Sequence, residues 1–179
     1  MPQAALLIVD VQKALVDGNP YRRDAFLADL SRLLILSQQK GIEPIYIQHD
    51  GGPGDELEAG TTGWEIADAI APGKEAKVFS KRKNSAFKET GLHAYLQERG
   101  MNTLILVGMQ TEYCIDATCK AAFDLDYSLI IPRGCTTTFD NDFFKGEALS
   151  RYYETKIWHG RFAQVVSPEE AVKLAVGDC

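Results

Sequence analysis

Short apolar runs rich in branched side chains alternate with segments of helical periodicity along this chain. Runs that are apolar throughout, rather than at every second residue, are typical of strands covered on both faces. The pattern predicts a three-layer α/β/α fold of the Rossmann-like kind, with a six-stranded parallel sheet of order 3-2-1-4-5-6. The predicted strands are residues 4–9, 43–48, 76–80, 103–108, 127–132 and 162–166.

The segments between these strands carry helix signals. Apolar side chains recur at helical spacing in residues 24–41, which end at a glycine, a common closing residue of helices. A terminal helix is predicted to begin after Ser167, which serves as its N-cap. The connection at residues 49–73 is longer than a simple link requires, so it is a candidate binding loop. Further helices are predicted at residues 88–100, 112–125 and 142–155.

Size and charge exclude several classes of protein. The chain has 179 residues, of which 45% are hydrophobic, so residues 1–179 are expected to form a single domain. The formal net charge is −6, and the Lys and Arg residues are scattered, which leaves no basic stripe for nucleic acid. The N-terminal apolar run ends at Asp10, too early for a signal peptide or a membrane span. We therefore expect a cytoplasmic protein that binds neither nucleic acid nor membranes.

The chain has 4 cysteines without a secretory signal, which indicates reduced thiols rather than a disulfide framework. They are Cys114, Cys119, Cys135 and Cys179. Two aromatic clusters, at residues 152–153 and 157–162, are candidates for exposure on a monomer. We therefore expect a homodimer or a higher homo-oligomer.

Reactive polar residues follow three of the predicted strands. Asp10 ends the first strand, and Cys114 follows the fourth at the start of a helix. Lys81 and Lys83 follow the third strand. Ligands of open parallel sheets bind beyond the carboxyl ends of the strands, where the strand order reverses. Because the predicted order makes the first and fourth strands neighbours, Asp10 and Cys114 are expected to face each other.

Cys114 is a candidate nucleophile because of its place at a helix start. Free N–H groups and the positive end of the helix dipole favour a thiolate there, and the same donors can bind an oxyanion. Asp10 can accept the thiol proton, and a lysine can keep that carboxylate charged. The alternative is that Cys114 is a small buried hydrophobe, and the cysteine alone does not decide between the two.

Three motifs resemble the isochorismatase-like cysteine hydrolases, a family that includes nicotinamidases. They are LLIVDVQ at 6–12, KRKNSAFKETGL at 81–92 and GMQTEYCIDATCKAAF at 108–123. The resemblance implies that Asp10 is the general base, Lys81 the charge stabiliser and Cys114 the nucleophile. Lys83 remains a rival to Lys81, because the register depends on a short motif.

The resemblance also implies a cis peptide bond between Met109 and Gln110. The backbone N–H groups of Gln110 and Cys114 would then form the oxyanion hole. The implied reaction is hydrolysis of a C–N amide bond in a small molecule through a thioester. Two alternatives stay open: a zinc-dependent nicotinamidase, and a member of the same fold that binds a small molecule without turnover. A third, isochorismatase activity on an enol ether, is disfavoured because the members that do that chemistry lack the cysteine.

Metal and cofactor are not expected. Nicotinamidases carry an Asp and two His after the second strand, whereas this chain has IQHDGGPGDE there, with His49 as its single histidine. Zinc needs at least three good ligands. The predicted substrate pocket comprises Gln12, His49, Trp64 and Tyr113. Three roles stay open for Gln12: it orients Asp10, it contacts the substrate, or it faces solvent at the start of a helix. Trp64 either forms part of the pocket wall or packs its own loop against the protein.

Overall fold

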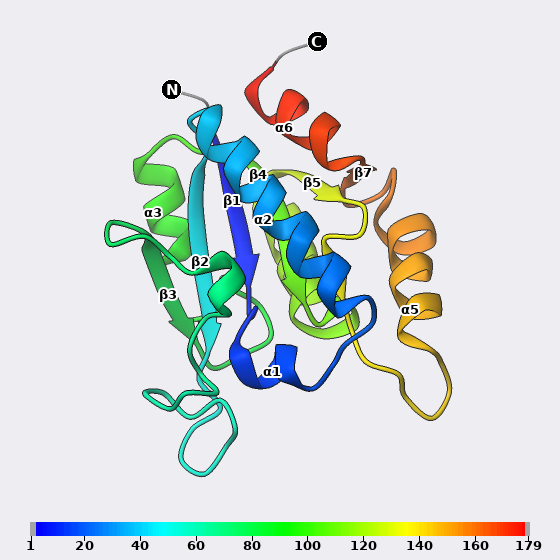
Figure 1. The fold of residues 1–179 in the computed structure, drawn as a ribbon. Helices are drawn as coiled ribbons and strands as arrows, with labels where there is room; N and C mark the ends of the chain where they lie inside the picture. The colour runs from blue at the N-terminus through cyan, green and yellow to red at the C-terminus, as the bar shows by residue number, and fades with distance from the viewer. Residues whose placement is uncertain (1–2, 178–179) are drawn as a thin grey trace.

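A computed structural model describes residues 3–177, and its centre is a parallel sheet of order β3-β2-β1-β4-β5-β7 (Figure 1). This confirms the predicted fold class and strand order, with β7 in the place of the predicted sixth strand. The strands on this path are β1 (Ala4–Val9), β2 (Glu43–His49), β3 (Lys77–Lys81), β4 (Thr103–Met109), β5 (Ser128–Pro132) and β7 (Gln164–Val166).

The sheet has 7 strands rather than the six predicted. The additional strand, β6 (Thr136–Thr137), pairs with the end of β4 and lies off the main path. Two threonines are too short a segment to give any hydrophobic periodicity. The sequence pattern therefore missed this strand.

The helices largely follow the predicted segments, with shorter bounds. The segment expected as one helix at 112–125 is split into a π-helical turn and an α-helix. Ser167 caps the last helix as predicted, accepting a hydrogen bond from Glu170 N at 3.3 Å. The α-helices are α1 (Lys13–Asp17), α2 (Arg23–Gln39), α3 (Leu92–Glu98), α4 (Asp116–Asp124), α5 (Gly146–Tyr152) and α6 (Pro168–Val176). The other helical segments are η1 (Asp68–Ile70), η2 (Thr111–Ile115) and η3 (Tyr153–Trp158).

The core lies on both faces of the sheet. Leu6 and Ile8 of β1 pack with α2 and α6 on one face, the face turned to the viewer in Figure 1. Leu7 on the same strand points to the other face, where α3 and α4 cover it. All 6 residues of β1 are buried, which explains why its sequence shows no polar alternation. Trp158, expected in an exposed cluster, is 0% exposed and belongs to this second core, so that part of the self-association argument is wrong.

The register of the sheet gathers the strand ends at one edge. His49 pairs with Lys81 across β2 and β3, and Val9 pairs with Gly108 across β1 and β4. Gly108 has a φ of +124°, and a Cβ there would lie 2.0 Å from the carbonyl oxygen of Val9. A glycine is therefore required where β1 and β4 approach each other. Within residues 3–177, no helix has the length and apolarity needed to cross a bilayer.

Candidate active site

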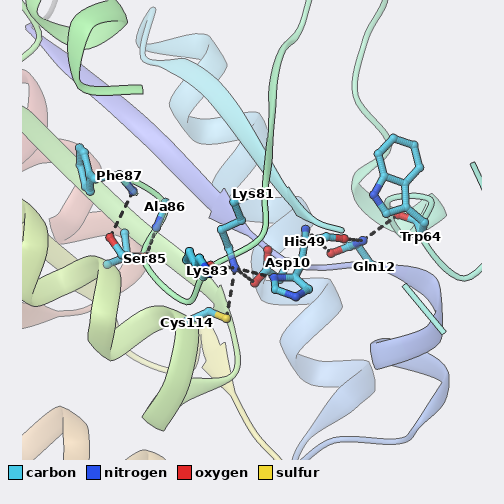
Figure 2. Close-up of polar contacts among 11 residues, drawn as sticks. Asp10, Gln12, His49, Trp64, Lys81, Lys83, Ser85, Ala86, Phe87 and Cys114 are labelled. Carbon is cyan, nitrogen blue, oxygen red and sulfur yellow. Dashed lines mark hydrogen bonds and ion pairs between the residues drawn. The ribbon is translucent and has the colours of Figure 1, made fainter. Parts of the chain in front are cut away.

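Lys81 lies at the centre of the polar cluster shown in Figure 2. Its Nζ is 2.7 Å from Asp10 Oδ2, and the side chains of the two residues are 0% and 2% exposed. The same ammonium donates to Cys114 Sγ at 3.3 Å and to the carbonyl oxygen of Lys83 at 3.0 Å. The structure thus brings together the base, the cation and the thiol that the sequence singled out.

Lys83 does not enter the cluster with its side chain. That side chain is exposed, and only its backbone carbonyl contacts Lys81. Alternation along an extended segment turns Lys81 inward at the end of β3, and the chain then leaves the sheet. Geometry therefore favours Lys81 over its rival.

Asp10 is held just beyond β1 in the left-handed backbone region, with φ of 53°. Its N–H donates to the carbonyl of Ile47 at 2.9 Å, which fixes the residue against β2. Oδ1 is buried and has no hydrogen-bond partner within the described residues. Burial raises the pKa of the Asp10 carboxyl, and the Lys81 ammonium is the largest influence that opposes this rise. One carboxylate oxygen is thus free to receive a proton.

Cys114 lies in η2, after the end of β4, and is half-buried. Burial, and next the charge of Asp10, raise the pKa of its thiol to about 12, although the Lys81 ammonium acts in the opposite direction. The expectation of a resting thiolate is therefore wrong. Backbone donors at a helix start favour a thiolate, but desolvation and the neighbouring Asp10 carboxylate act against it here.

The peptide bond between Met109 and Gln110 is cis, as the family resemblance implied. Gln110 and Cys114 both line the cavity in front of the thiol. The carbonyl of Gln110 accepts hydrogen bonds from Tyr113 N at 3.2 Å and Ile115 N at 3.1 Å. The oxyanion role of the Gln110 and Cys114 N–H groups stays a prediction.

The cavity in front of Cys114 has a volume of about 250 Å³. Tyr113 stands at its rim with 53% of its surface exposed, and His49 forms part of its wall, so these two pocket residues lie where the sequence predicted. A larger depression of about 620 Å³ near residues 18–25 contains no cysteine or histidine. The lining residues of the smaller cavity are Asp10, Leu15, His49, Asp55, Glu56, Leu57, Asn84, Met109, Gln110, Tyr113 and Cys114.

His49 contacts the cluster through its imidazole. Nδ1 is 3.2 Å from Lys81 Nζ. An ammonium can only donate, so a hydrogen bond between these two atoms requires Nδ1 to accept and puts the ring proton of the neutral imidazole on Nε2. Burial lowers the pKa of His49, and the Lys81 ammonium lowers it further, against smaller opposing effects of nearby carboxylates.

Gln12 and Trp64 do not line the cavity, which corrects two of the four predicted pocket residues. The Gln12 amide is buried and donates to the carbonyls of His49 at 3.0 Å and Trp64 at 2.9 Å. Its oxygen accepts from His49 N at 2.8 Å. Gln48 also donates to the Trp64 carbonyl, at 3.0 Å. Gln12 therefore fastens the long loop to β2, and the Trp64 side chain points away from Cys114 (Figure 2).

Six lining residues were missed from the sequence, namely Leu15, Asp55, Glu56, Leu57, Asn84 and Met109. Three of them lie in the 49–73 connection, whose unusual length was the available signal. Which of its side chains face inward depends on hydrogen bonds within the loop, such as Gly51 N to the Leu57 carbonyl at 3.1 Å. Such contacts leave no periodic trace in a sequence.

Two other thiols, Cys119 and Cys135, do not line the cavity. Cys119 and Cys135 are buried and unpaired, and Cys119 belongs to the hydrophobic core. Cys179 lies outside the described residues. Among residues 3–177, no three or more His, Cys, Asp or Glu side chains are grouped so that they could hold a metal ion. The absence of a metal in the functional protein stays a prediction.

Comparison with known proteins identifies the family. The sequence model of the isochorismatase domain matches residues 4–170. A streptothricin hydrolase of Streptomyces noursei is 34% identical over 138 residues, 76% of this chain and 50% of the relative. The chain thus spans about half the length of the two streptothricin hydrolases that it matches, 50% of one and 56% of the other.

Two further similarities cover most of both chains. The ureidoacrylate amidohydrolase RutB of Agrobacterium fabrum is 23% identical over 181 residues, 80% of this chain and 79% of the relative. A crystal structure of an isochorismatase family protein superposes with a TM-score of 0.86 at 29% identity, covering 92% of this chain and 98% of the other. Fold, motifs and sequence similarity agree: the chain belongs to the isochorismatase family.

Proposed function

We propose that this protein is a metal-independent cysteine hydrolase that cleaves the C–N bond of a small amide through a thioester intermediate. The observation that carries the proposal is the position of Lys81 Nζ, within reach of Asp10 Oδ2 at 2.7 Å and Cys114 Sγ at 3.3 Å. Asp10 and Cys114 line one cavity, and the buried Lys81 side chain contacts both of them. The relatives named as a hydrolase and an amidohydrolase support the reaction class.

In the first half of the reaction, Asp10 Oδ1 takes the proton of the Cys114 thiol. Sγ then forms a bond to the carbonyl carbon of the amide, and the carbonyl π electrons move onto oxygen. In this proposal the N–H groups of Gln110 and Cys114 stabilise that oxyanion. Lys81 offsets the negative charge that moves from carboxylate to sulfur to oxygen.

In the second half, the protonated Asp10 donates its proton to the departing nitrogen as the C–N bond breaks, which leaves an acyl group on sulfur. Water attacks this thioester while Asp10 accepts a proton from it. The C–S bond then breaks, the acid leaves, and Asp10 returns its proton to the thiolate. The raised pKa of Cys114 suits this cycle, because the thiol gives up its proton only when a substrate can use the thiolate.

A panel of small amides tests the proposal, with release of ammonia or amine as the readout. The panel includes primary amides, lactams, ureido compounds, streptothricin and ureidoacrylate. Cys114→Ala is expected to abolish turnover, whereas Cys119→Ala, a matched change of a thiol outside the cavity, is expected to retain it. Rapid acid quenching and intact mass measurement should show an acyl adduct on Cys114, and activity should survive exhaustive chelation.

Two results would overturn the proposal. Turnover that persists in Cys114→Ala removes the nucleophile. Activity that is lost on chelation and regained with zinc assigns the chemistry to a metal instead.

A further inference from the structure

The mouth of the cavity is acidic. Asp55 and Glu56, on the loop after β2, both line it, and Asp10 lies at its base. No Lys or Arg side chain is among the lining residues. Arg82, a basic side chain beside this loop, is already engaged by Asp50, with Nη2 to Oδ2 at 2.7 Å and Nε to Oδ2 at 3.0 Å. Lys13, a second one, is paired with Glu65 at 2.7 Å and Asp68 at 3.0 Å in the same loop.

Neither rim carboxylate has a cationic partner within residues 3–177. Asp55 Oδ1 accepts a hydrogen bond from Leu57 N at 2.8 Å. Within residues 3–177 this is the one hydrogen bond that the Asp55 side chain forms. Glu56 is exposed and forms no ion pair or side-chain hydrogen bond there. Both carboxylates therefore have free oxygens at the entrance to the cavity.

Contacts within the loop fix the position of the Asp55 side chain. A Cβ on Gly51 would lie 2.1 Å from Asp55 Oδ1, so the carboxylate rests directly on the backbone of that glycine. Asp50 accepts from Gly52 N at 2.9 Å, and Glu58 accepts from Gly54 N at 2.8 Å. These contacts fix the turn that carries Asp55.

A second observation points to a ligand in the same cavity. Asp10 is 1% exposed and lines the cavity, and its Oδ1 has no hydrogen-bond partner in the described structure. An unpartnered buried acceptor is costly unless a bound group satisfies it. The cavity thus offers an acceptor at its base and free carboxylates at its mouth.

We infer that the substrate carries a cationic group, an ammonium or a guanidinium, which is bound by Asp55 and Glu56 while the amide lies at Cys114. This inference rests on the proposed function and adds the charge class of the substrate to it. An anionic amide would meet like charge at the mouth of the cavity and would be disfavoured.

Three amides of equal chain length test this inference: an ω-aminoalkanamide, the unsubstituted alkanamide and the ω-carboxyalkanamide. The amino form is expected to have the highest kcat/KM and the carboxy form the lowest. Asp55→Asn keeps the oxygen that accepts from Leu57 N, so it removes charge without releasing the turn. Asp55→Asn and Glu56→Gln should each reduce the preference for the amino form by about two- to fivefold, as expected for partly exposed ion pairs.

The control is Glu98→Gln, which removes the same charge from the exposed surface of α3 and should leave the preference unchanged. Raising the salt concentration should weaken the preference, since exposed charges are screened. A preference for the neutral amide, or one that survives Asp55→Asn and Glu56→Gln together, would overturn the inference while leaving the hydrolase proposal intact.

Binding of the same three amides to Cys114→Ala separates the two proposals. If no amide is hydrolysed, the proposed function fails, but tighter binding of the amino form that is weakened in Asp55→Asn still supports the acidic mouth as a cation site. Equal affinity for all three compounds, or no measurable binding of any, shows that the inference is wrong.

Discussion

Lys81 and Asp10 form an ion pair almost wholly removed from solvent, with Nζ and Oδ2 2.7 Å apart. Two charges taken out of water in this way stabilise a protein only when each compensates the other. The sheet supplies that compensation through its strand order, since β1 and β3 flank β2 and bring the two side chains to one edge. The pair therefore couples the candidate chemistry to the stability of the fold.

Replacing Lys81 by Met should destabilise the protein strongly. The change leaves the Asp10 carboxylate buried without its cation, a loss of about 3–5 kcal/mol in the free energy of unfolding. The double variant Asp10→Asn with Lys81→Met removes both charges and should recover much of that loss. Urea unfolding measures all three proteins, and a Lys81→Met variant as stable as the parent would contradict the buried pair.

Replacing Asp10 by Asn should separate thiol reactivity from turnover. The Asp10 charge raises the pKa of Cys114, so its removal lowers that pKa from about 12 and leaves the Lys81 ammonium to favour a thiolate. Alkylation of Cys114 by iodoacetamide should become about tenfold faster for each unit by which its pKa falls. Turnover should nevertheless drop by about 10²- to 10⁴-fold, because the proton acceptor is lost.

Peptide mapping of the alkylated protein provides the control for this experiment. Cys119 and Cys135 are buried, and their labelling should not respond to the Asp10 change. Slower alkylation of Cys114 in Asp10→Asn would mean that the carboxylate promotes thiolate formation in the resting protein.

The parallel sheet and the meeting of Asp10 with Cys114 were predictable from local signals, whereas the choice of Lys81 over Lys83 came from the resemblance to a known family. Continuous apolar runs mark strands buried on both faces, and parallel strands end at one edge. The predictions of pocket residues failed where hydrogen bonds to backbone groups far away in the sequence decide the position of a side chain. Gln12 bonds to residues 37 and 52 positions away, and no periodicity encodes such contacts. The state of the Cys114 thiol likewise depends on burial and on Asp10, neither of which a helix-start motif contains.

His49 should make stability fall towards acid pH. Its pKa is lowered from the ordinary value of 6.5 because of burial first and Lys81 second, while Asp10, Asp55 and Asp50 oppose the shift. Between the lowered pKa and 6.5 the unfolded chain therefore binds the proton and the folded protein does not. The contribution of the neutral ring is fully present above pH 6.5 and is lost as pH falls through the lowered pKa.

The variant His49→Asn tests this pH dependence. Its amide oxygen can take the place of Nδ1 as the acceptor for Lys81 and does not titrate. Unfolding measured from pH 7.5 to pH 5 should show the parent losing stability relative to His49→Asn. Parallel curves for the two proteins would show that His49 does not change its protonation in this range.

Self-association stays a prediction, and the structure suggests a different surface for it. Phe143 and Phe144 are 87% and 57% exposed on the connection before α5. Large apolar side chains in water favour burial against a partner. Sedimentation should show a homo-oligomer that dissociates when both are changed to Ser. A monomeric parent at micromolar concentration would contradict the prediction.

Gln12 should control both the stability of the loop and the shape of the cavity. Its amide nitrogen donates to the His49 and Trp64 carbonyls, and its oxygen accepts from His49 N. Gln12→Glu retains the acceptor and loses both donors, which leaves the partly buried His49 carbonyl without this partner. We expect a loss of about 1–3 kcal/mol in unfolding free energy, and a larger one if the carboxylate stays charged.

The loop should respond more than the rest of the molecule to this change. Residues 49–64 carry Asp55, Glu56 and Leu57 to the cavity, and Gln12 joins both ends of that segment. Hydrogen exchange should therefore quicken across residues 49–64 in Gln12→Glu while β4 stays protected. KM for the best amide should rise more than kcat falls, because Asp10, Lys81 and Cys114 keep their own contacts. Uniform exchange across the whole sheet would instead show that Gln12 supports the fold globally, and the loop would then have no separate anchor.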